Sequence, residues 1–308
     1  MKVCFIGSML FAAKILDQLN QVFPVNLVVT QPDRKVGRKQ VIKGTPVKEK
    51  AVELGIPTFQ PKNIKKDHQR IIDEHFDLII VAAYGQFIPD DVLYHATYQA
   101  INVHASLLPK YRGGTPMHRA IINGDPMTGV SIMYMVKKMD AGPVLAQESL
   151  PIDKEDNVAS LEVKLADLGA SLLIETIRQL INRGVKAIPQ NHSEATYAYH
   201  FHDDEKKIDV NQSAKDCYNL VRGMYPWPIA EIDISGKRMK IYEADYLEEN
   251  KSDCIGQVVI INDQGVHIQT KDGLFIIKEC QLEGKKRMDI QSFMNGAGRE
   301  LFVLNKAI

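Results

Sequence analysis

The chain has 308 residues, of which 45% are hydrophobic, so it is long enough to bury a substantial core, and its length favours two domains over one. Lysine plus arginine and aspartate plus glutamate both total 38, so a formal net charge of zero excludes a general attraction to nucleic acid or acidic lipid. The longest apolar run, 78–83, is far shorter than the ~20 residues of a membrane-spanning helix. Because the amino terminus reads as a strand rather than a signal peptide, the sequence predicts a cytoplasmic protein with no membrane contact.

The amino-terminal half alternates apolar, strand-like runs with helical patterns. Strands are predicted at 3–6, 25–30, 78–83, 100–103 and 130–136, and helices begin near residues 11 and 46. This alternation predicts an α/β domain with a mostly parallel, doubly wound, Rossmann-like sheet. A long amphipathic helix over 158–182, capped by Asp156 or Asn157 and followed by Gly184, is expected to close the domain.

The polar and irregular stretch 189–204 predicts a linker between a first domain of residues 1–188 and a second domain of residues 205–308. In the second domain a helix is expected over 213–222. Five short strands follow at 229–234, 240–244, 257–261, 266–270 and 274–282, with glycine-containing turns between several of them. Short strands at this spacing predict a small, OB-like β-barrel.

The turn after the first strand bears on the choice of cofactor. A dinucleotide site requires Gly-x-Gly-x-x-Gly there, whereas Gly7 is followed by Ser-Met-Leu-Phe, so no dinucleotide is predicted. The four cysteines are scattered and suggest neither a zinc site nor a disulfide framework. Ligands of open α/β sheets bind beyond the carboxyl ends of the strands, so chemistry is expected where the strands end, near Tyr84, at His104 and beyond residue 136.

Asn102 and His104 are two residues apart on a predicted strand, so their side chains lie on the same side. Such residues are often a turn former and a buried histidine with a backbone partner. The glycine-rich, polar stretch 106–114 favours instead a backbone that approaches a ligand. Asp140 follows the strand at 130–136 and is by itself as readily an ordinary turn residue. A carboxylate near a histidine would raise the pKa of that histidine and orient it.

Together these motifs resemble the folate-dependent formyltransferases. The resemblance rests on Asn-x-His with Ser-Leu-Leu-Pro and Arg-Gly-Gly, on Gly-Val-Ser-Ile-Met at 129–133 and on the Asp140 turn. Further matches at 30–34, 37–38, 45–48, 83–85, 222–228 and 284–288 extend it over nearly the whole chain and point to members that act on an aminoacylated tRNA. It implies 10-formyltetrahydrofolate as the formyl donor, the amino group of methionine on initiator tRNA as the acceptor, no metal, and a monomer.

The resemblance also implies residue roles. Attack of the amine on the formyl carbon develops an oxyanion, which His104 and the amide of Asn102 would stabilise. Asp140 would keep His104 charged and assist removal of the proton from the nitrogen, without a covalent intermediate. Backbone groups of two loops would hold the folate, although Tyr84 and Gly85 are equally readable as a plain turn. The predicted folate-binding residues are Tyr84, Gly85, Ser106, Leu107, Leu108, Pro109 and Gly142.

A basic loop over 34–44 lies between the second strand and the next helix. Charge runs are usually just solvated surface, but the resemblance implies that Arg38, Lys39 and Lys43 contact the tRNA acceptor stem. It also places Phe11 at the pocket for the acceptor methionine. The preceding Ser-Met-Leu lacks the proline usual in the family, and Val210 stands where a tryptophan is usual. The second domain would track tRNA backbone with basic residues, namely Lys237, Arg238, Lys240, Lys285, Lys286 and Arg287.

Two alternatives stay open. The first is a formyltransferase or hydrolase that acts on a small molecule, for which the basic loop would have no role. The second is an inactive relative that only binds RNA. The presence of Asn102, His104 and Asp140 together counts against the second alternative.

Overall fold

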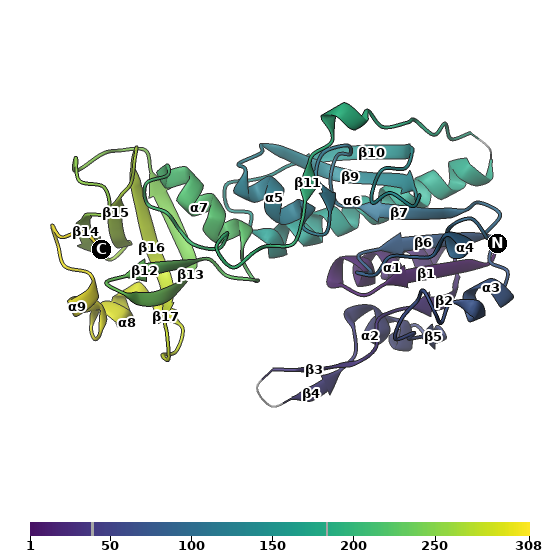
Figure 1. Ribbon diagram of the computed structural model, residues 1–308, viewed down its shortest axis with the longest axis horizontal. Coiled ribbons are helices and arrows are strands. Elements are labelled where there is room, and N and C mark those ends of the chain that lie inside the picture. The colour runs from purple at the N-terminus through teal and green to yellow at the C-terminus, as the bar shows by residue number, and fades with distance from the viewer. Residues whose placement is uncertain (38–39, 183) are drawn as a thin grey trace. The chain divides into compact units, whose positions relative to one another are not determined.

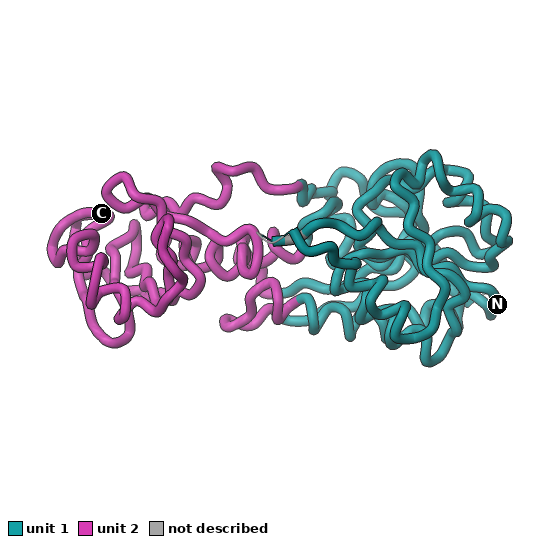
Figure 2. Tube along the Cα trace, turned by 90° about the horizontal axis from the view of Figure 1, so that it is seen from below, with its two compact units in different colours: residues 1–116, 127–151, 162–199 teal, residues 117–126, 152–161, 200–308 magenta. Residues whose placement is uncertain are grey.

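The structure is a computed structural model that describes residues 1–37, 40–182 and 184–308. The chain divides into two compact units (Figure 2). Unit 1 comprises residues 1–116, 127–151 and 162–199, and unit 2 comprises residues 117–126, 152–161 and 200–308. The change from unit 1 to unit 2 at 199–200 falls within the stretch 189–204, whose role as a linker stays a prediction.

A seven-stranded sheet forms the centre of unit 1, in the order β10-β9-β7-β6-β1-β2-β5 (Figure 1). Neighbouring strands from β7 to β5 pair in parallel, as the alternating pattern predicted. Every residue of β1, β6 and β7 is buried. This burial explains why β1 and β6 are continuous apolar runs rather than alternating patterns, whereas β7 also carries Asn102 and His104. The parallel strands are β1 (Val3–Gly7), β2 (Val25–Val29), β5 (Thr58–Phe59), β6 (Leu78–Ala82) and β7 (Ala100–His104).

The far edge of this sheet reverses direction. Strand β9 (Met127–Tyr134) pairs antiparallel with β7, and β10 (Val144–Pro151) pairs antiparallel with β9. The sequence predicted β9 but not β10, because most of β10 is half-buried or exposed and lacks an apolar run. The loop 135–143 between β9 and β10 carries Asp140.

Local sequence signals account for the helix termini. Thr45 accepts a hydrogen bond from the Lys48 amide at 3.1 Å and Pro46 begins α2. Of the two predicted caps of α6, Asn157 accepts the Ser160 amide at 3.0 Å. The Gly184 amide donates to the Gln179 carbonyl at 2.8 Å past the end of α6. The helices up to this point are α1 (Leu10–Val22), α2 (Pro46–Glu53), α3 (Gln69–Asp73), α4 (Asp90–Leu93), α5 (Pro116–Ile122) and α6 (Val158–Ile181).

The predicted basic loop forms a two-stranded hairpin that projects from unit 1 (Figure 1). Its strands are β3 (Arg34–Val36) and β4 (Val41–Lys43). Arg34 pairs with Lys43, and Lys35 pairs with Ile42. Strands this short and this polar give no apolar alternation that a sequence pattern could detect. Arg38 and Lys39, both predicted to bind tRNA, lie outside the described residues.

The five strands predicted in the second domain form an antiparallel sheet in unit 2, in the order β12-β13-β16-β15-β14, with β17 beside β16. Its apolar core includes Met239, Ile268 and Phe275, and α7 packs against β13 and β16. None of the helices in the described ranges is both long and apolar enough to cross a bilayer. The elements are α7 (Ala214–Gly223), β12 (Glu231–Ile234), β13 (Lys237–Leu247), β14 (Val258–Asn262), β15 (Gly265–Gln269), β16 (Leu274–Leu282), β17 (Met288–Asp289), α8 (Ile290–Met294) and α9 (Gly298–Leu301).

Candidate active site

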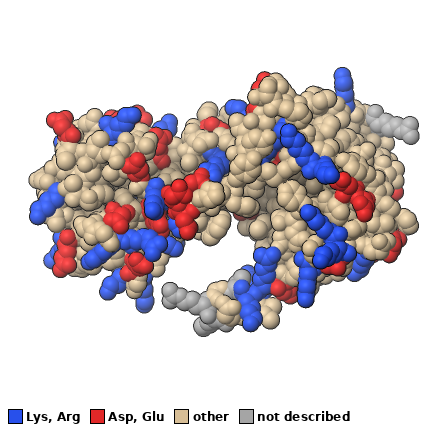
Figure 3. Space-filling model, in the orientation of Figure 1, with Lys and Arg blue, Asp and Glu red and all other residues tan. Residues whose placement is uncertain are grey.

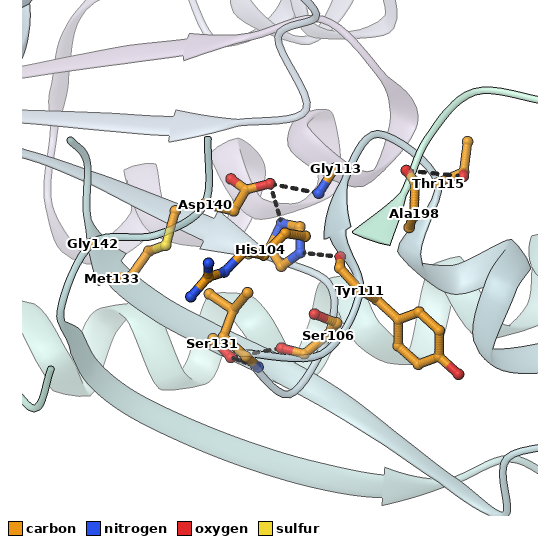
Figure 4. Close-up of polar contacts among 12 residues, drawn as sticks. His104, Ser106, Tyr111, Gly113, Thr115, Ser131, Met133, Asp140, Gly142 and Ala198 are labelled. Atoms are coloured by element: carbon orange, nitrogen blue, oxygen red, sulfur yellow. Dashed lines mark hydrogen bonds and ion pairs between the residues drawn. The ribbon is translucent and has the colours of Figure 1, made fainter. Parts of the chain in front are cut away.

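The three residues predicted to be catalytic come together at the carboxyl end of β7. Asn102 and His104 are both in β7, where they pair with Met133 and Ser131 of β9. The loop after β9 brings Asp140 to His104, with 3.7 Å between His104 Nδ1 and Asp140 Oδ2 (Figure 4). When the imidazole carries both of its protons, the two side chains form an ion pair.

Both ring nitrogens of His104 face oxygen atoms. Nε2 lies 2.9 Å from the carbonyl oxygen of Tyr111. A carbonyl can only accept, so Nε2 carries a hydrogen and donates it. The side chains of His104 and Asp140 are only 6% and 14% exposed, so solvent screens their interaction weakly. Asn102 is 8% exposed, and its carboxamide has no hydrogen-bond partner among the described residues, which leaves its N–H groups able to donate to a ligand.

Asp140 and the neighbouring Gly113 both have backbone conformations with a positive φ. Asp140 has a φ of +46°, in the left-handed region, and its Oδ2 accepts a hydrogen bond from the Gly113 amide at 2.8 Å (Figure 4). Gly113 has a φ of +125°, and a Cβ there would lie 2.5 Å from the carbonyl oxygen of Ala198. Only glycine fits that position. The Arg-Gly-Gly signal in the sequence therefore corresponds to a close backbone approach beside Asp140.

Part of the stretch 189–204, which the sequence predicts to be a linker, packs against the segment around Gly113. Strand β11 (Tyr197–Ala198) pairs in parallel with β8 (Arg112–Gly113). Thr115 strengthens this contact, since its hydroxyl donates to the carbonyl oxygens of Ala198 at 3.2 Å and Tyr199 at 2.8 Å. A short 3-10 helix, η1 (His192–Glu194), precedes β11. Residues 197–199 therefore pack directly against Gly113 and Thr115.

The loop 106–109, predicted to hold the folate, is held in place by hydrogen bonds to the Ser131 side chain. The fully buried Ser131 hydroxyl donates to the Ser106 carbonyl at 2.6 Å and accepts from the Leu108 amide at 3.0 Å. Gln147 Nε2 donates to the Leu108 carbonyl at 2.8 Å. Sequence reasoning did not single out Ser131 or Gln147. The available signal was that Ser131 lies within the Gly-Val-Ser-Ile-Met motif at 129–133, to which no role was assigned.

The second predicted folate segment, Tyr84 and Gly85, follows β6. Tyr84 is 3% exposed and belongs to the apolar core, and its buried hydroxyl has no partner among the described residues. Burial raises the pKa of Tyr84 to about 12. The Tyr84 carbonyl accepts from Gln31 Nε2 at 2.6 Å. Gly85 has a φ of +83°. The Tyr84 ring therefore serves the core, and the folate contact of this segment, which stays a prediction, would be made by its backbone.

Gly142 and Phe11 are both in close-packed surroundings. A Cβ at Gly142 would lie 1.8 Å from the Tyr134 carbonyl oxygen, so a side chain is excluded there. Phe11 is 2% exposed in the first turn of α1, and its amide donates to Glu162 Oε1 at 3.0 Å. Burial raises the pKa of that glutamate. Met9, by contrast, is 57% exposed. The role of Phe11 in an acceptor pocket stays a prediction.

Lys43, the third predicted tRNA contact, lies in β4. Its side chain is 62% exposed, and its Nζ is 3.9 Å from Glu49 Oε1, a loose and exposed ion pair. Concerning metals, the part of the chain that the structure describes contains no group of three or more His, Cys, Asp or Glu side chains placed to hold an ion.

Comparison with known proteins agrees with this geometry. Residues 1–177 match the formyl transferase family, and residues 201–298 match the formyl transferase C-terminal domain. The methionyl-tRNA formyltransferase of Streptococcus thermophilus is 44% identical over 306 residues, covering 98% of this chain and 97% of the relative. That of Listeria monocytogenes is 42% identical over 303 residues, covering 97% of each chain.

Solved structures share the fold at low identity. An N-formyltransferase from Helicobacter canadensis, in complex with folinic acid and dTDP-3-aminofucose, superposes with a TM-score of 0.68 at 18% identity, covering 94% of this chain and all of its own. HypX from Aquifex aeolicus, in complex with tetrahydrofolic acid, gives a TM-score of 0.66 at 18% identity over 99% of this chain, which spans about half (48%) of HypX. Both the matched domains and the near-full-length identity lead to one conclusion: the chain belongs to the formyl transferase family, in the group of the methionyl-tRNA formyltransferases.

Proposed function

We propose that this protein transfers the formyl group of 10-formyltetrahydrofolate to the amino group of methionine esterified to initiator tRNA. The observation that carries the proposal is the pairing of His104 with Asp140 at the end of a central strand. Beside them lies Asn102, whose carboxamide has no hydrogen-bond partner among the described residues. The relatives named as methionyl-tRNA formyltransferases over the full length support the choice of acceptor.

The first step is attack of the neutral amine on the formyl carbon, which turns the formyl oxygen into an oxyanion. Asn102 is free to donate to that oxygen. His104 Nε2–H already donates to the Tyr111 carbonyl, so the formyl oxygen has to share this hydrogen or replace Tyr111 as its acceptor. Each donor of this kind typically contributes ~10²–10³ in rate.

The second step is loss of the proton from the attacking nitrogen. The bond between the formyl carbon and N10 of the folate then breaks, N10 takes up a proton, and tetrahydrofolate leaves. Asp140 is 14% exposed, and its Oδ2 is bound by the Gly113 amide. The other carboxylate oxygen, Oδ1, accepts no hydrogen bond among the described residues. That oxygen is therefore free to receive the proton through a water molecule, while Oδ2 stays opposite His104. Positioned acid–base groups contribute ~10²–10⁴.

The hairpin β3–β4 supports a polyanionic acceptor. Arg34 and Lys43 pair directly across the hairpin, and like charges in that position destabilise a hairpin in isolation. An anionic partner that binds both side chains would neutralise these charges and relieve their repulsion. Figure 3 shows basic side chains on and beside this hairpin. Lys43, together with Arg38 and Lys39, would contact phosphates of the acceptor stem, so binding would weaken with added salt.

The test is to supply purified protein with 10-formyltetrahydrofolate and one of three acceptors: Met-tRNA, free methionine or a small amino sugar. The expected result is formylation of Met-tRNA and of neither small amine. Formylation of only a small amine would identify the small-molecule alternative. Binding of tRNA without formylation of any acceptor would identify an RNA-binding relative.

The hairpin is tested separately with Arg38→Ala, and with Lys66→Ala as an exposed control elsewhere in unit 1. Arg38→Ala is expected to raise KM for Met-tRNA and reduce its salt dependence while KM for the folate is unchanged. If the Arg38→Ala and Lys66→Ala enzymes have the same KM for Met-tRNA and the same salt dependence, Arg38 has no part in tRNA recognition.

A further inference from the structure

Arg112 is among the largest fully buried side chains of the described residues, with 0% exposure. Its Nε and Nη2 donate to Gln190 Oε1 at 3.1 and 2.6 Å, and Nη2 also donates to His192 Nδ1 at 3.0 Å. Its Nη1 has no partner, and no carboxylate pairs with the guanidinium, within the described residues. Burying a cation with this incomplete compensation costs free energy, so its position needs another explanation than stability.

The Gln190 side chain uses all of its polar atoms. Its oxygen accepts from Arg112. Its nitrogen donates to the carbonyl oxygens of Asp140 at 2.9 Å and Gly142 at 2.7 Å. Since the guanidinium can only donate, the oxygen must face Arg112 and the nitrogen must face the two carbonyls. One carboxamide therefore ties the β9–β10 loop to β8.

The result is that Asp140 is held at two points by consecutive residues of β8. Gly113 holds the carboxylate through its amide, and Arg112 holds the backbone through Gln190. The second hold matters because Asp140 has a φ of +46°, a conformation that a non-glycine residue keeps only where its surroundings impose it. A relaxation of this backbone would move Oδ2 away from both Gly113 and His104.

We propose that Arg112 and Gln190 are positioning residues, which act on formyl transfer by fixing the backbone of residues 140–142 so that the Asp140 carboxylate meets His104. The proposal rests on the proposed function in so far as Asp140 takes part in the reaction. It also gives the Arg-Gly-Gly motif two functions, a side-chain one at Arg112 and a backbone one at Gly113.

The decisive variant is Gln190→Glu. The glutamate still accepts from Arg112 and supplies a negative charge to it, but it has no N–H to give to the carbonyls of Asp140 and Gly142. We expect kcat for Met-tRNA formylation to fall ~10–100-fold, as misplacement of a catalytic group by about 1 Å does. KM for Met-tRNA should change less than ~3-fold, because the residues predicted to contact the tRNA are unaltered. KM for the folate is not a criterion, because Gly142, a predicted folate contact, also loses a hydrogen bond. Gln264→Glu, the same change in an exposed turn of unit 2, is the matched control and should equal the unaltered protein.

The double variant Arg112→Met with Gln190→Met separates positioning from folding. It removes the buried cation together with its partner, a replacement that is often neutral or stabilising. If Arg112 and Gln190 served only folding, this variant would regain full kcat. We expect it to unfold at a similar denaturant concentration to the unaltered protein and yet to keep the low kcat.

Hydrogen exchange of the Gly113 amide gives a readout that needs no activity, because this amide donates to the Asp140 carboxylate. Its exchange rate is expected to rise by ~10-fold or more in Gln190→Glu and to stay unchanged in Gln264→Glu. Unchanged exchange, or a kcat within threefold of the unaltered protein, would overturn the positioning role. If the unaltered protein formylates no acceptor, the proposed function fails, whereas the exchange experiment still decides whether Gln190 holds Asp140.

Discussion

The Asp140→Asn substitution is the sharpest test of the site, because it removes one charge and little else. The asparagine Oδ1 can still accept the Gly113 amide hydrogen, which Asp140 Oδ2 accepts at 2.8 Å. The loop backbone therefore keeps its hydrogen bonds from Gln190. What is lost is the negative charge 3.7 Å from His104 Nδ1.

The magnitude follows from that separation. Two unit charges 3.7 Å apart interact by about 4.5 kcal/mol at an effective dielectric constant of ~20, which sets an upper limit for the loss. His104 and Asp140 are 6% and 14% exposed, so screening reduces it only in part. The expected fall in kcat is therefore ~10²–10³-fold, since about 1.4 kcal/mol corresponds to tenfold. KM for both substrates should stay within about threefold, because the substituted group acts on the transition state.

Single-turnover formylation of Met-tRNA measures this effect directly. The protein offers a matched control in Asp91→Asn, because Asp91 Oδ2 lies 3.2 Å from His68 Nε2 in an Asp–His pair whose aspartate is 70% exposed. That substitution should leave kcat within twofold. If Asp140→Asn retained more than a fifth of the activity while folding normally, Asp140 would have no electrostatic role in the reaction and the mechanism would need another source of catalysis.

Three further predictions concern stability. Ser131→Ala leaves the Ser106 carbonyl and the Leu108 amide without their partner. It should therefore lower the free energy of unfolding in urea by about 2–3 kcal/mol and raise KM for the folate. An unchanged KM would mean that this loop does not bind the folate. Tyr84→Phe removes a buried hydroxyl that has no partner among the described residues, so stability should stay the same or rise by about 1 kcal/mol; a loss above that would reveal a hidden partner. Burial lowers the pKa of His118 from 6.5 to about 4. The unfolded chain therefore binds this proton at a higher pH than the folded protein does, so the free energy of unfolding should rise by up to about 3 kcal/mol from pH 4 to pH 6.5. His118→Gln should flatten this rise, and an equally steep pH dependence in that variant would assign it to other groups.

Regular patterns in the sequence determined the central elements. Strands β1 and β6 are apolar runs because both of their faces are covered, and such runs are visible without any structure. The α6 terminus was readable because a cap acts on residues three positions away. Helices α3 and α4 were missed, since five and four residues give less than two turns of periodicity.

The same division holds for the site. By itself the sequence determined that Asn102 and His104 share one side of a strand, because alternation is a local property of the backbone. Only the tertiary structure decided which oxygen faces Nδ1 of His104, and that Gln190 and Arg112 hold the Asp140 loop. These contacts join residues 36, 50 and 78 positions apart. Their geometry depends on how β8, β9 and β10 pack, and no periodic pattern along the chain records that packing.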